Sequence, residues 1–392
     1  MGARGEDLGR EVGPVTSFIS AGAAQGLVKA AAGEAGIEVE GSFGAVGAML
    51  DKFRAGEPCD VVILTDSQIA DLTARAEVIP GTSADLGTVP TAIAVREGRD
   101  LPDVSNEAAL RAALLAAGAI YSPDPARSTA GIHFGKVIDQ LGIRSQVEGR
   151  LRHFPNGAAA MKAMAEDGGN PIGCTQATEI LATPGARLVQ PLPKGFDLET
   201  VYTAAVAARA AQAKAAGDFV NRLAGEASRA ARIRAGFRGY VIRAATNADG
   251  ADVRDVVQQV LTEYGLAMDS AGVDADLADL VASYSARGGG FDVAIDGGTG
   301  AIAGCCGIYP IDARTCELRK MYVLRDARGH GLGGRLLRRS LAFARGRGLR
   351  RVELETASAL KEAIAIYAGA GFQPIQRAHL ANRCDQAFAL DL

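Results

Sequence analysis

A glycine-rich loop near the C-terminus has the composition of an anion-binding cradle. Residues 328–333 read Arg-Gly-His-Gly-Leu-Gly and lie between an apolar strand expected at 321–324 and an apolar-striped helix expected from about 334 to 344. Glycines allow a tight turn whose N–H groups point into one cavity, and the helix start adds partial positive charge. The loop therefore predicts a pyrophosphate site, and few cofactors carry that group.

Two other classes of glycine loop fit this segment poorly. Gly329, Gly331 and Gly334 satisfy the GxGxxG spacing of dinucleotide-binding folds, and Glu353 follows where a ribose-binding acid would stand. A polar segment at 325–328 separates the strand from the first glycine, however, and too few residues follow Glu353 for the remaining βαβ units. A Walker phosphate loop is excluded because no Gly-Lys-Ser or Gly-Lys-Thr follows.

The spacing Arg-x-x-Gly-x-Gly from Arg328 to Gly333, with Glu317 before it and Tyr367 beyond it, resembles the GNAT superfamily of N-acetyltransferases. Residues from about 240 to 392 carry the resemblance, which includes the segments 316–323, 354–356 and 365–372. The resemblance implies an α+β domain with a mixed, mostly antiparallel central sheet. It also implies acetyl-CoA as cosubstrate, a pantetheine arm between two splayed strands, and direct acetyl transfer to an amine.

The resemblance assigns catalytic roles to two side chains. Acetyl transfer needs a neutral amine, a stabilised carbonyl oxygen and a proton for the departing thiolate. Glu317 is the candidate base, with Glu355 on the neighbouring strand in reserve, and Tyr367 is the candidate proton donor because phenol and thiol pKa values are close. The structural alternatives to these roles are that Glu317 is a solvent-exposed residue of its strand and that Tyr367 packs in the core. An asparagine common in the family is Leu360 here, which puts one usual pantetheine or helix-capping contact in doubt.

The resemblance places the cofactor contacts on the strand backbone and on the loop. These residues are Met321, Tyr322, Val323, Arg328, Gly329, His330, Gly331, Leu332, Gly333 and Gly334. Because strand side chains alternate, we expect Glu317, Arg319 and Met321 on one face and Leu318, Lys320 and Tyr322 on the other. A basic cluster follows the loop, as a solvated helix face or as a landing area for the 3′-phosphate of coenzyme A. Its members are Arg335, Arg338, Arg339, Arg345, Arg347, Arg350 and Arg351.

Acceptor selection is expected to rest on polar residues near the first two helices of this half, together with the reserve base. The candidates are Tyr264, Asp269, Tyr284 and Glu355, and a solvated surface explains them about as well. Cys316 stands beside Glu317, which raises the alternative of an acyl-cysteine intermediate. No histidine neighbours this cysteine in sequence, and direct transfer needs no covalent intermediate.

The first half of the chain alternates short apolar strands with Ala-rich helices, the pattern of an open α/β sheet. Strands are expected at 15–19, 37–43, 60–64, 119–121 and 188–190. The segments 18–22, 43–47, 59–64, 122–131 and 236–237 resemble the molybdate-type bacterial periplasmic solute-binding proteins. That resemblance implies two α/β lobes around a cleft, the type 2 periplasmic-binding fold. We expect this domain to span residues 1–238 and the acetyltransferase domain to span 239–392.

The ligand of the first domain is expected to differ from molybdate. Members of that family hold the oxyanion with hydroxyls on two loops, and the equivalent positions here are Gly22 and Val46. A buried tetrahedral oxyanion without those donors would lose hydrogen bonds that cost several kcal/mol to omit. Residues that could line the cleft for another small ligand, or act as ordinary turn and cap residues, are Ser20, Arg127, Ser128, Thr129, Thr175 and Gln176.

Composition excludes several other classes of protein. The net charge of -3 argues against a chain-wide nucleic-acid surface. The six cysteines contain no CxxC pair and the four histidines lack ligand spacing, so we expect buried reduced thiols and no metal. No apolar run is long enough for a membrane span. A leader-like stretch at 12–28 is interrupted by Gly, Pro, Ser and Gln, so we expect it to form the first strand and helix of a cytoplasmic protein.

These features together predict a two-domain α/β protein, and the abundance of Ala and Gly suggests a bacterial source. A solute-binding domain that senses a small ligand is fused to an acetyl-CoA-dependent N-acetyltransferase acting on a small amine or an amino-acid-like acceptor. Two alternatives stay open: a ligand-binding protein whose second half binds coenzyme A without turnover, and a protein or peptide acetyltransferase. The acceptor, the ligand of the first domain and the oligomeric state are not determined by the sequence.

Overall fold

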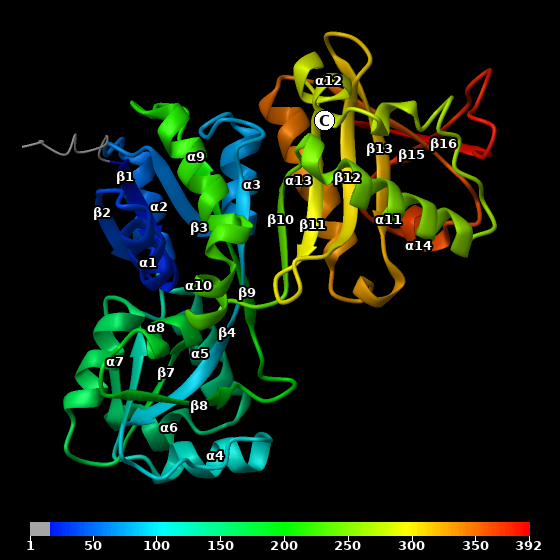
Figure 1. The fold of residues 1–392 in the computed structure, drawn as a ribbon. Helices are drawn as coiled ribbons and strands as arrows, with labels where there is room; N and C mark the ends of the chain where they lie inside the picture. Colours follow the sequence, from blue (N-terminus) through cyan, green and yellow to red (C-terminus); the bar gives the residue numbers. More distant parts are fainter. Residues whose placement is uncertain (1–15) are drawn as a thin grey trace, which may run out of the picture.

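The computed structural model describes residues 16–392, and its ribbon shows two N-terminal lobes beside a C-terminal α+β part (Figure 1). The two-domain α/β architecture is confirmed. The start of the first strand at Val15 lies outside the described residues. From Thr16 on, the leader-like stretch forms a strand, a short 3-10 helix and the beginning of a helix, as expected; these elements are β1 (Thr16–Ala21), η1 (Gly22–Ala24) and α1 (Gln25–Ala35).

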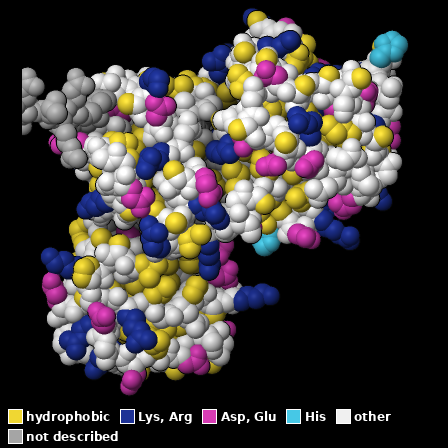
Figure 2. Space-filling view, viewed as in Figure 1, with side chains coloured by type: hydrophobic (Ala, Val, Ile, Leu, Met, Phe, Trp, Pro, Cys, Tyr) yellow, Lys and Arg dark blue, Asp and Glu magenta, His cyan; other side chains and the backbone are white. Residues whose placement is uncertain are grey.

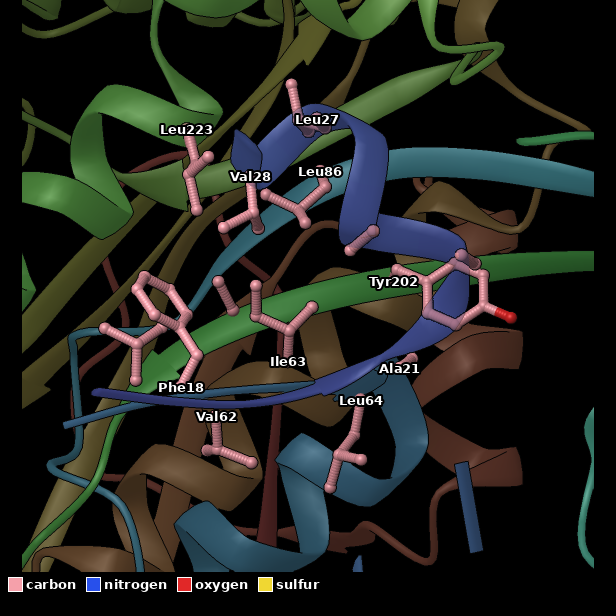
Figure 3. Close-up of a cluster of buried hydrophobic side chains, with 14 of the residues drawn as sticks. Phe18, Ala21, Leu27, Val28, Val62, Ile63, Leu64, Leu86, Tyr202 and Leu223 are labelled. Carbon is pink, nitrogen blue, oxygen red and sulfur yellow. The ribbon is translucent and has the colours of Figure 1, made fainter. Parts of the chain in front are cut away.

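Lobe 1 is built on parallel strands with helices on both sides. Strand β1 pairs in parallel with its two neighbours, and the last strand of the lobe returns antiparallel. The strands are β2 (Val39–Gly44), β3 (Val61–Thr65) and β9 (Glu199–Val206), and the helices are α2 (Val46–Arg54), α3 (Asp66–Ala74), α9 (Ala213–Ala224) and α10 (Arg229–Arg234). Apolar side chains from both layers, Phe18, Leu27, Ile63 and Leu223 among them, meet in a buried core (Figure 3).

Lobe 2 repeats this layering with its own core around Ile93, Ile120 and Phe134. Its strands are β5 (Ala119–Pro123), β6 (Leu151–Phe154), β7 (Pro171–Gln176) and β8 (Ala186–Pro191). Its helices are α4 (Glu107–Ala116), α5 (Thr129–Gln140), α6 (Arg144–Val147), α7 (Gly157–Glu166) and α8 (Ala177–Leu181), with a 3-10 turn at η2 (Glu148–Arg150).

A long strand, β4 (Ala84–Arg96), passes from one lobe into the other. Its first half pairs with β9 in lobe 1 and its second half pairs with β7 and β8 in lobe 2. This strand was not predicted from the sequence, because Gly87 and Pro90 are residue types that usually weaken or end a strand. The register shifts between Asp85 and Gly87, and Gly87 has a φ of 124°, so the glycine accommodates an irregularity that other residues would resist.

The C-terminal part has a mixed, mostly antiparallel sheet, as predicted. Strands β10 to β13 are antiparallel, β13 and β14 are parallel, and β16 closes the sheet against β14 and β15. The strands are β10 (Tyr240–Ala244), β11 (Gly290–Asp296), β12 (Ile302–Pro310), β13 (Thr315–Val323), β14 (Arg351–Thr356), β15 (Gln373–Ile375) and β16 (Gln386–Asp391). The helices are α11 (Gly250–Glu263), α12 (Leu280–Ser283), α13 (Leu332–Gly346) and α14 (Lys361–Gly369).

The segment 275–283 contains two short helices, η5 (Ala275–Leu277) and α12. Asp279 stands between the two and its carboxylate accepts a hydrogen bond from the Ala282 amide, which starts a new helix. Helices α11 and α12 cover one face of the sheet and α13 and α14 cover the other, each with its own apolar cluster.

The two parts of the chain share one hydrogen-bonded sheet, because Arg243 of β10 pairs with Ala84 of β4. Helix α13 packs against α3 of lobe 1. On the face seen in Figure 2, Lys and Arg side chains are interspersed with Asp and Glu. None of the helices between residues 16 and 392 combines the length and apolar character needed to cross a bilayer.

Candidate active site

A pocket of about 240 Å³ opens where β13 and β14 part from each other. The two strands pair in parallel only over Thr315 to Glu317 and Arg351 to Glu353. Beyond that point each strand continues without the other, and residues of both line the pocket. The separation of adjacent strands leaves backbone N–H and C=O groups free along the opening.

A β-bulge at Lys320 changes which side chains share a face of β13. Lys320 has a φ of 54°, and the register against β12 shifts between Cys305 and Gly307. Leu318 and Met321 consequently pack in the same cluster against α13 and α14, while Tyr322 packs on the α11 side. The prediction that Met321 shares a face with Glu317 is wrong, because the extra residue of a bulge inverts the alternation beyond it.

The Lys320 side chain ties this bulge to the loop between α11 and α12. Its Nζ lies 2.6 Å from the Val273 carbonyl oxygen and 2.9 Å and 3.3 Å from carboxylate oxygens of Asp274 and Asp276. Three acceptors saturate the ammonium, and the side chain is 4% exposed. The left-handed conformation is thus held by a buried ion cluster, which offsets the strain of a non-glycine residue there.

The glycine loop has the geometry of an anion cradle. Gly329 and Gly331 have φ values of 82° and 69°, which side chains with a Cβ adopt reluctantly. Gly331 caps α13 and no side chain bonds the helix start. The first amides of α13, from Leu332 to Gly334, therefore have no partner within the helix.

Side chains around the loop hold it in place and do not fill it. Arg328 donates to the Val323 carbonyl oxygen and forms two hydrogen bonds of 2.7 and 2.8 Å to Glu263, so its guanidinium is bound to α11. Leu332 is buried in the core of this part, and His330 lies beside the ring of Tyr240. Anion binding by this loop would thus fall to its backbone.

The candidate base lies in the pocket, at the point where the strands part. Glu317 is 9% exposed, accepts a hydrogen bond of 2.7 Å from Arg319 Nε and has Arg377 Nη1 at 3.8 Å. Glu355 lies on the pocket wall of β14 and bonds Arg377 and the amide of Ala381. Both carboxylates line the same space, so either one can reach an amine there.

Tyr367 reaches the same pocket from α14 and is 5% exposed. Burial raises the pKa of its phenol well above the ordinary value, with smaller contributions from Cys306, Tyr322 and Cys384. The raised pKa keeps this phenol protonated, so it can donate a hydrogen bond or a proton in the pocket. It also removes the close match between phenol and thiol pKa values that was expected from the sequence, because a phenol that is hard to ionise transfers its proton to a thiolate less readily. Leu360, at the position of the common asparagine, also lines the pocket.

The cysteines do not form a second catalytic system. Burial raises the pKa of Cys316 to about 12, which keeps this thiol protonated and weakly nucleophilic. Cys384, which is partly exposed and lines the pocket, has its pKa raised to about 11 for the same reason. The other four cysteines are buried.

Three of the acceptor residues expected from the sequence lie outside the pocket. Tyr284 is fully buried among apolar side chains and its hydroxyl donates to Asp276, so it cannot contact an acceptor. Asp269 closes the turn at Gly272, and Tyr264 donates to Glu362 and stacks on Arg328. Only Glu355 of this group lines the pocket.

The basic cluster after the loop also differs from the prediction. Arg335, Arg338 and Arg339 face the first domain and pair with acidic side chains or carbonyl groups there and on β11. They are unavailable as a landing area for a coenzyme phosphate.

Two arginines of the pocket were missed. Arg377 and Arg383 lie in the segment between β15 and β16, and both line the pocket. Arg377 bonds Glu353 and Glu355, and Arg383 bonds Asp274 through both of its terminal nitrogens. No motif marks this segment, and only the return of β16 beside β14 brings it to the pocket.

The residues predicted for the first domain are brought together only in part. Ser20 is buried and donates to the Ala21 carbonyl, whereas Arg127 is exposed and pairs with Asp51. Ser128 is the N-cap of α5, and Thr129 is the first residue of that helix. Both positions fit the alternative that these are ordinary turn and cap residues. Thr175 and Gln176 are buried at the end of β7. Within residues 16–392 no cluster of metal-ligating side chains occurs.

Comparison with known proteins matches both parts of the chain. The family of bacterial extracellular solute-binding proteins matches residues 17–238, and the acetyltransferase (GNAT) family matches residues 258–372. The uncharacterized N-acetyltransferase YjgM of Escherichia coli is 38% identical over 143 residues, which are 35% of this chain and 84% of that protein. The chain belongs to both families.

Two further similarities concern the solute-binding domain. Aconitate isomerase of a Pseudomonas species is 27% identical over 178 residues, and the match covers 45% of this chain and 66% of that protein. The periplasmic molybdate-binding protein of Azotobacter vinelandii is 17% identical with a TM-score of 0.48, covering 57% of this chain and 98% of that one. The C-terminal part is a GNAT N-acetyltransferase domain, and acetyl-CoA is the cosubstrate of this activity.

Proposed function

We propose that this protein transfers an acetyl group from acetyl-CoA to the amine of a small, amino-acid-like acceptor, and that its solute-binding domain adjusts this activity in response to a small ligand. The observation that supports the reaction is the meeting of Glu317, Glu355 and Tyr367 in one pocket between β13 and β14. An acid and a base thus converge where two strands part, in a domain of the GNAT family.

Each step of the proposed reaction has a candidate side chain or backbone group. Acetyl-CoA supplies an activated acyl group, and the backbone of the loop from Gly329 to Gly334 holds its diphosphate. Glu317, or Glu355 beside it, takes the proton of the incoming ammonium group directly or through water. Backbone N–H groups of β13 near the bulge stabilise the carbonyl oxygen, and Tyr367 gives a proton to the leaving thiolate.

The charges of the pocket favour an acceptor that carries both an amine and a carboxylate. Its lining includes two acidic side chains, Glu317 and Glu355, and a larger set of basic ones. The basic side chains are Arg319, Arg377 and Arg383, which also pair with Glu317, Glu355 and Asp274, and Lys320, whose ammonium is held by Asp274 and Asp276. A carboxylate of the acceptor would therefore share the arginines with these acidic side chains. Arginine recognises a carboxylate through paired N–H donors, so an amino acid would satisfy both signs of charge. The volume of about 240 Å³ also suits a small acceptor better than a folded protein.

A panel of amines tests this proposal through release of free thiol from acetyl-CoA by the full chain. Amino acids should serve as acceptors, and the matching amines without a carboxylate should serve less well. If none of the amines supports turnover although acetyl-CoA binds measurably, the result would favour the alternative of a ligand-binding protein without activity. Since the reaction consumes acetyl-CoA, a cytoplasmic location is part of the proposal.

A further inference from the structure

The space between the two lobes of the solute-binding domain holds a carboxylate of the chain itself. Glu179, in α8, is 7% exposed although no cation among residues 16–392 pairs with it. Burial raises the pKa of Glu179, and hydrogen bonds from Thr175 and from the amides of Gln176, Gly157 and Ala158 act in the opposite direction. A buried carboxyl group needs such partners, and here they come from several elements at once.

Lobe 2 binds this carboxyl group with a hydroxyl and a helix start. Thr175 Oγ1 donates to Glu179 Oε2 over 2.6 Å. At the start of α7 the Ala159 amide donates to the Asn156 side chain over 2.8 Å, and Gly157, the first residue of the helix, lies against the Glu179 carboxyl group. A ten-residue helix thus directs its positive end at the carboxyl group. These donors are the type that a bound oxyanion would need.

Lobe 1 leaves room for the same carboxyl group. A Cβ at Gly22 of lobe 1 would lie 2.7 Å from Glu179 Oε1, so the absence of a side chain there makes room for the carboxyl group. On the lobe 2 side, a Cβ at Gly157 would lie 1.9 Å from Oε2. Gly22 is the position at which the resemblance to molybdate-type proteins calls for a hydroxyl. The Glu179 carboxyl group of lobe 2 therefore fills the space that a side chain at Gly22 of lobe 1 would need.

The lobes are in contact around this group. The Gly47 amide of lobe 1 donates to the Arg127 carbonyl of lobe 2 over 3.1 Å, and Arg127 pairs with Asp51. Helices α7 and α8 of lobe 2 also touch η1 of lobe 1. A solute-binding fold closes its lobes around what it binds, and in this structure the carboxyl group of Glu179 lies buried between the lobes.

We propose that the first domain contains a carboxylate-binding site between its lobes, and that Glu179 occupies this site as an internal ligand that keeps the lobes together. Tetrahedral oxyanions such as molybdate and sulfate are excluded because the Glu179 carboxyl group takes their space and their donors. A solute that enters the site must carry a carboxylate that displaces Glu179. This inference is independent of the acetyltransferase reaction.

The test removes the internal ligand and supplies a free one. In Glu179→Ala the melting temperature of the full chain should fall, and formate or acetate should restore it in a saturable way. Chloride at the same ionic strength should not restore it. The wild-type protein should gain nothing from formate, since its site is filled. Hydrogen exchange at the Gly47 amide should become faster in Glu179→Ala and slow again with formate, because that amide reports contact between the lobes.

Two further variants separate a binding site from an ordinary structural loss. Glu166→Ala removes an exposed glutamate from the end of α7 and should neither destabilise the chain nor respond to formate. Adding Thr175→Val to Glu179→Ala should weaken the response to formate several-fold. If Glu179→Ala does not fold, refolding is compared with and without formate, and a higher yield with formate is expected. The proposal would be overturned if no carboxylate restored the melting temperature of Glu179→Ala, or if the wild-type protein bound molybdate.

Discussion

Asp85 of β4 and Arg335 of α13 form a buried ion pair that joins the solute-binding domain to the acetyltransferase domain. Asp85 also accepts hydrogen bonds from Thr203 Oγ1 at 2.6 Å and from the Ile242 amide at 3.1 Å. Strand β4 is the strand that passes between the two lobes, and the Arg335 amide donates to Gly331, the cap of the glycine loop. If the lobes regulate the acetyltransferase as proposed, this contact is the route by which a change in them would reach the glycine loop.

Asp85→Ala should destabilise the chain and weaken its binding of acetyl-CoA. The substitution removes the nearer of the two carboxylates that pair with Arg335, whose side chain is 12% exposed, and leaves it Asp66 at 3.7 Å and the Tyr240 carbonyl. Loss of one member of a buried pair costs about 3–5 kcal/mol, and these remaining partners place the expected cost at the lower end of that range. Chemical denaturation measures the stability, and calorimetry measures the affinity for acetyl-CoA. Arg338→Ala is the control, because Arg338 is 48% exposed and its pair with Asp66 is worth at most about 1 kcal/mol. Equal effects of the two substitutions would contradict the proposed route.

Glu317→Gln and Tyr367→Phe should each lower kcat by roughly 10²- to 10⁴-fold, the range of a positioned general base or acid. Affinity for acetyl-CoA should stay unchanged, since neither side chain belongs to the glycine loop. Thiol release measures the rate and calorimetry the affinity. Glu353→Gln is a matched control on β14 that pairs with Arg351 and Arg377 without lining the pocket. If Glu355→Gln abolishes turnover while Glu317→Gln does not, Glu355 is the base.

Gly331→Ala should weaken the binding of acetyl-CoA. A residue with a Cβ at a φ of 69° costs about 1–2 kcal/mol, which corresponds to roughly 5- to 30-fold in affinity if the loop relaxes away from its cradle conformation. Gly217→Ala is the control, because a Cβ at Gly217 meets nothing within 4 Å and Gly217 lies inside α9, outside the glycine loop. Calorimetry with coenzyme A should find the control close to wild type. An unchanged affinity in Gly331→Ala would argue against a backbone cradle.

The stability of the acetyltransferase domain should fall in acid because of Asp274. Burial alone would raise the pKa of Asp274, but hydrogen bonds from Arg383, the Asp269 amide and Lys320 lower it to about 2. A carboxyl group with a depressed pKa stabilises the fold above its unfolded pKa of about 4, and this stability is lost as the pH falls from about 4 to about 2. The loss should be on the order of 2 kcal/mol.

Denaturation of the full chain at several pH values between 2 and 5 measures this loss. In Asp274→Asn the same step should be absent, although the variant should be less stable at neutral pH because Lys320 and Arg383 lose a charged partner. A wild-type acid profile identical to that of Asp274→Asn would show that another group is responsible.

Local patterns in the sequence predicted the parts of the molecule that depend on neighbours along the chain. The glycine loop follows from the residues it contains, and the strand order of the second half follows from apolar segments separated by turns. The missed strand β4 shows the limit, because Gly87 and Pro90 have the signature of a loop. That segment is a strand because β9, β7 and β8 all supply hydrogen bonds to it.

The site shows the same limit. Family motifs mark both Glu317 and Tyr367, and the structure brings both to one pocket, while their catalytic roles stay predictions. Met321 was placed on the wrong face, because a single left-handed residue, Lys320, inverts the alternation, and an ion cluster from a distant loop holds it there. Tyr284 has a polar tip that suggests a surface role, yet Asp276 bonds that tip inside the core.

By itself, the sequence determined that this chain contains a solute-binding domain followed by a GNAT acetyltransferase domain with a glycine cradle, because short-range spacing encodes turns, helix starts and strand order. Only the tertiary structure decided that Arg335 reaches Asp85, that Arg377 and Arg383 line the pocket between β13 and β14, and that Glu179 lies between the lobes. Those relations join residues far apart in the chain. Each of them buries a charged or polar group, and such a group is stable only where the folded chain supplies all of its partners.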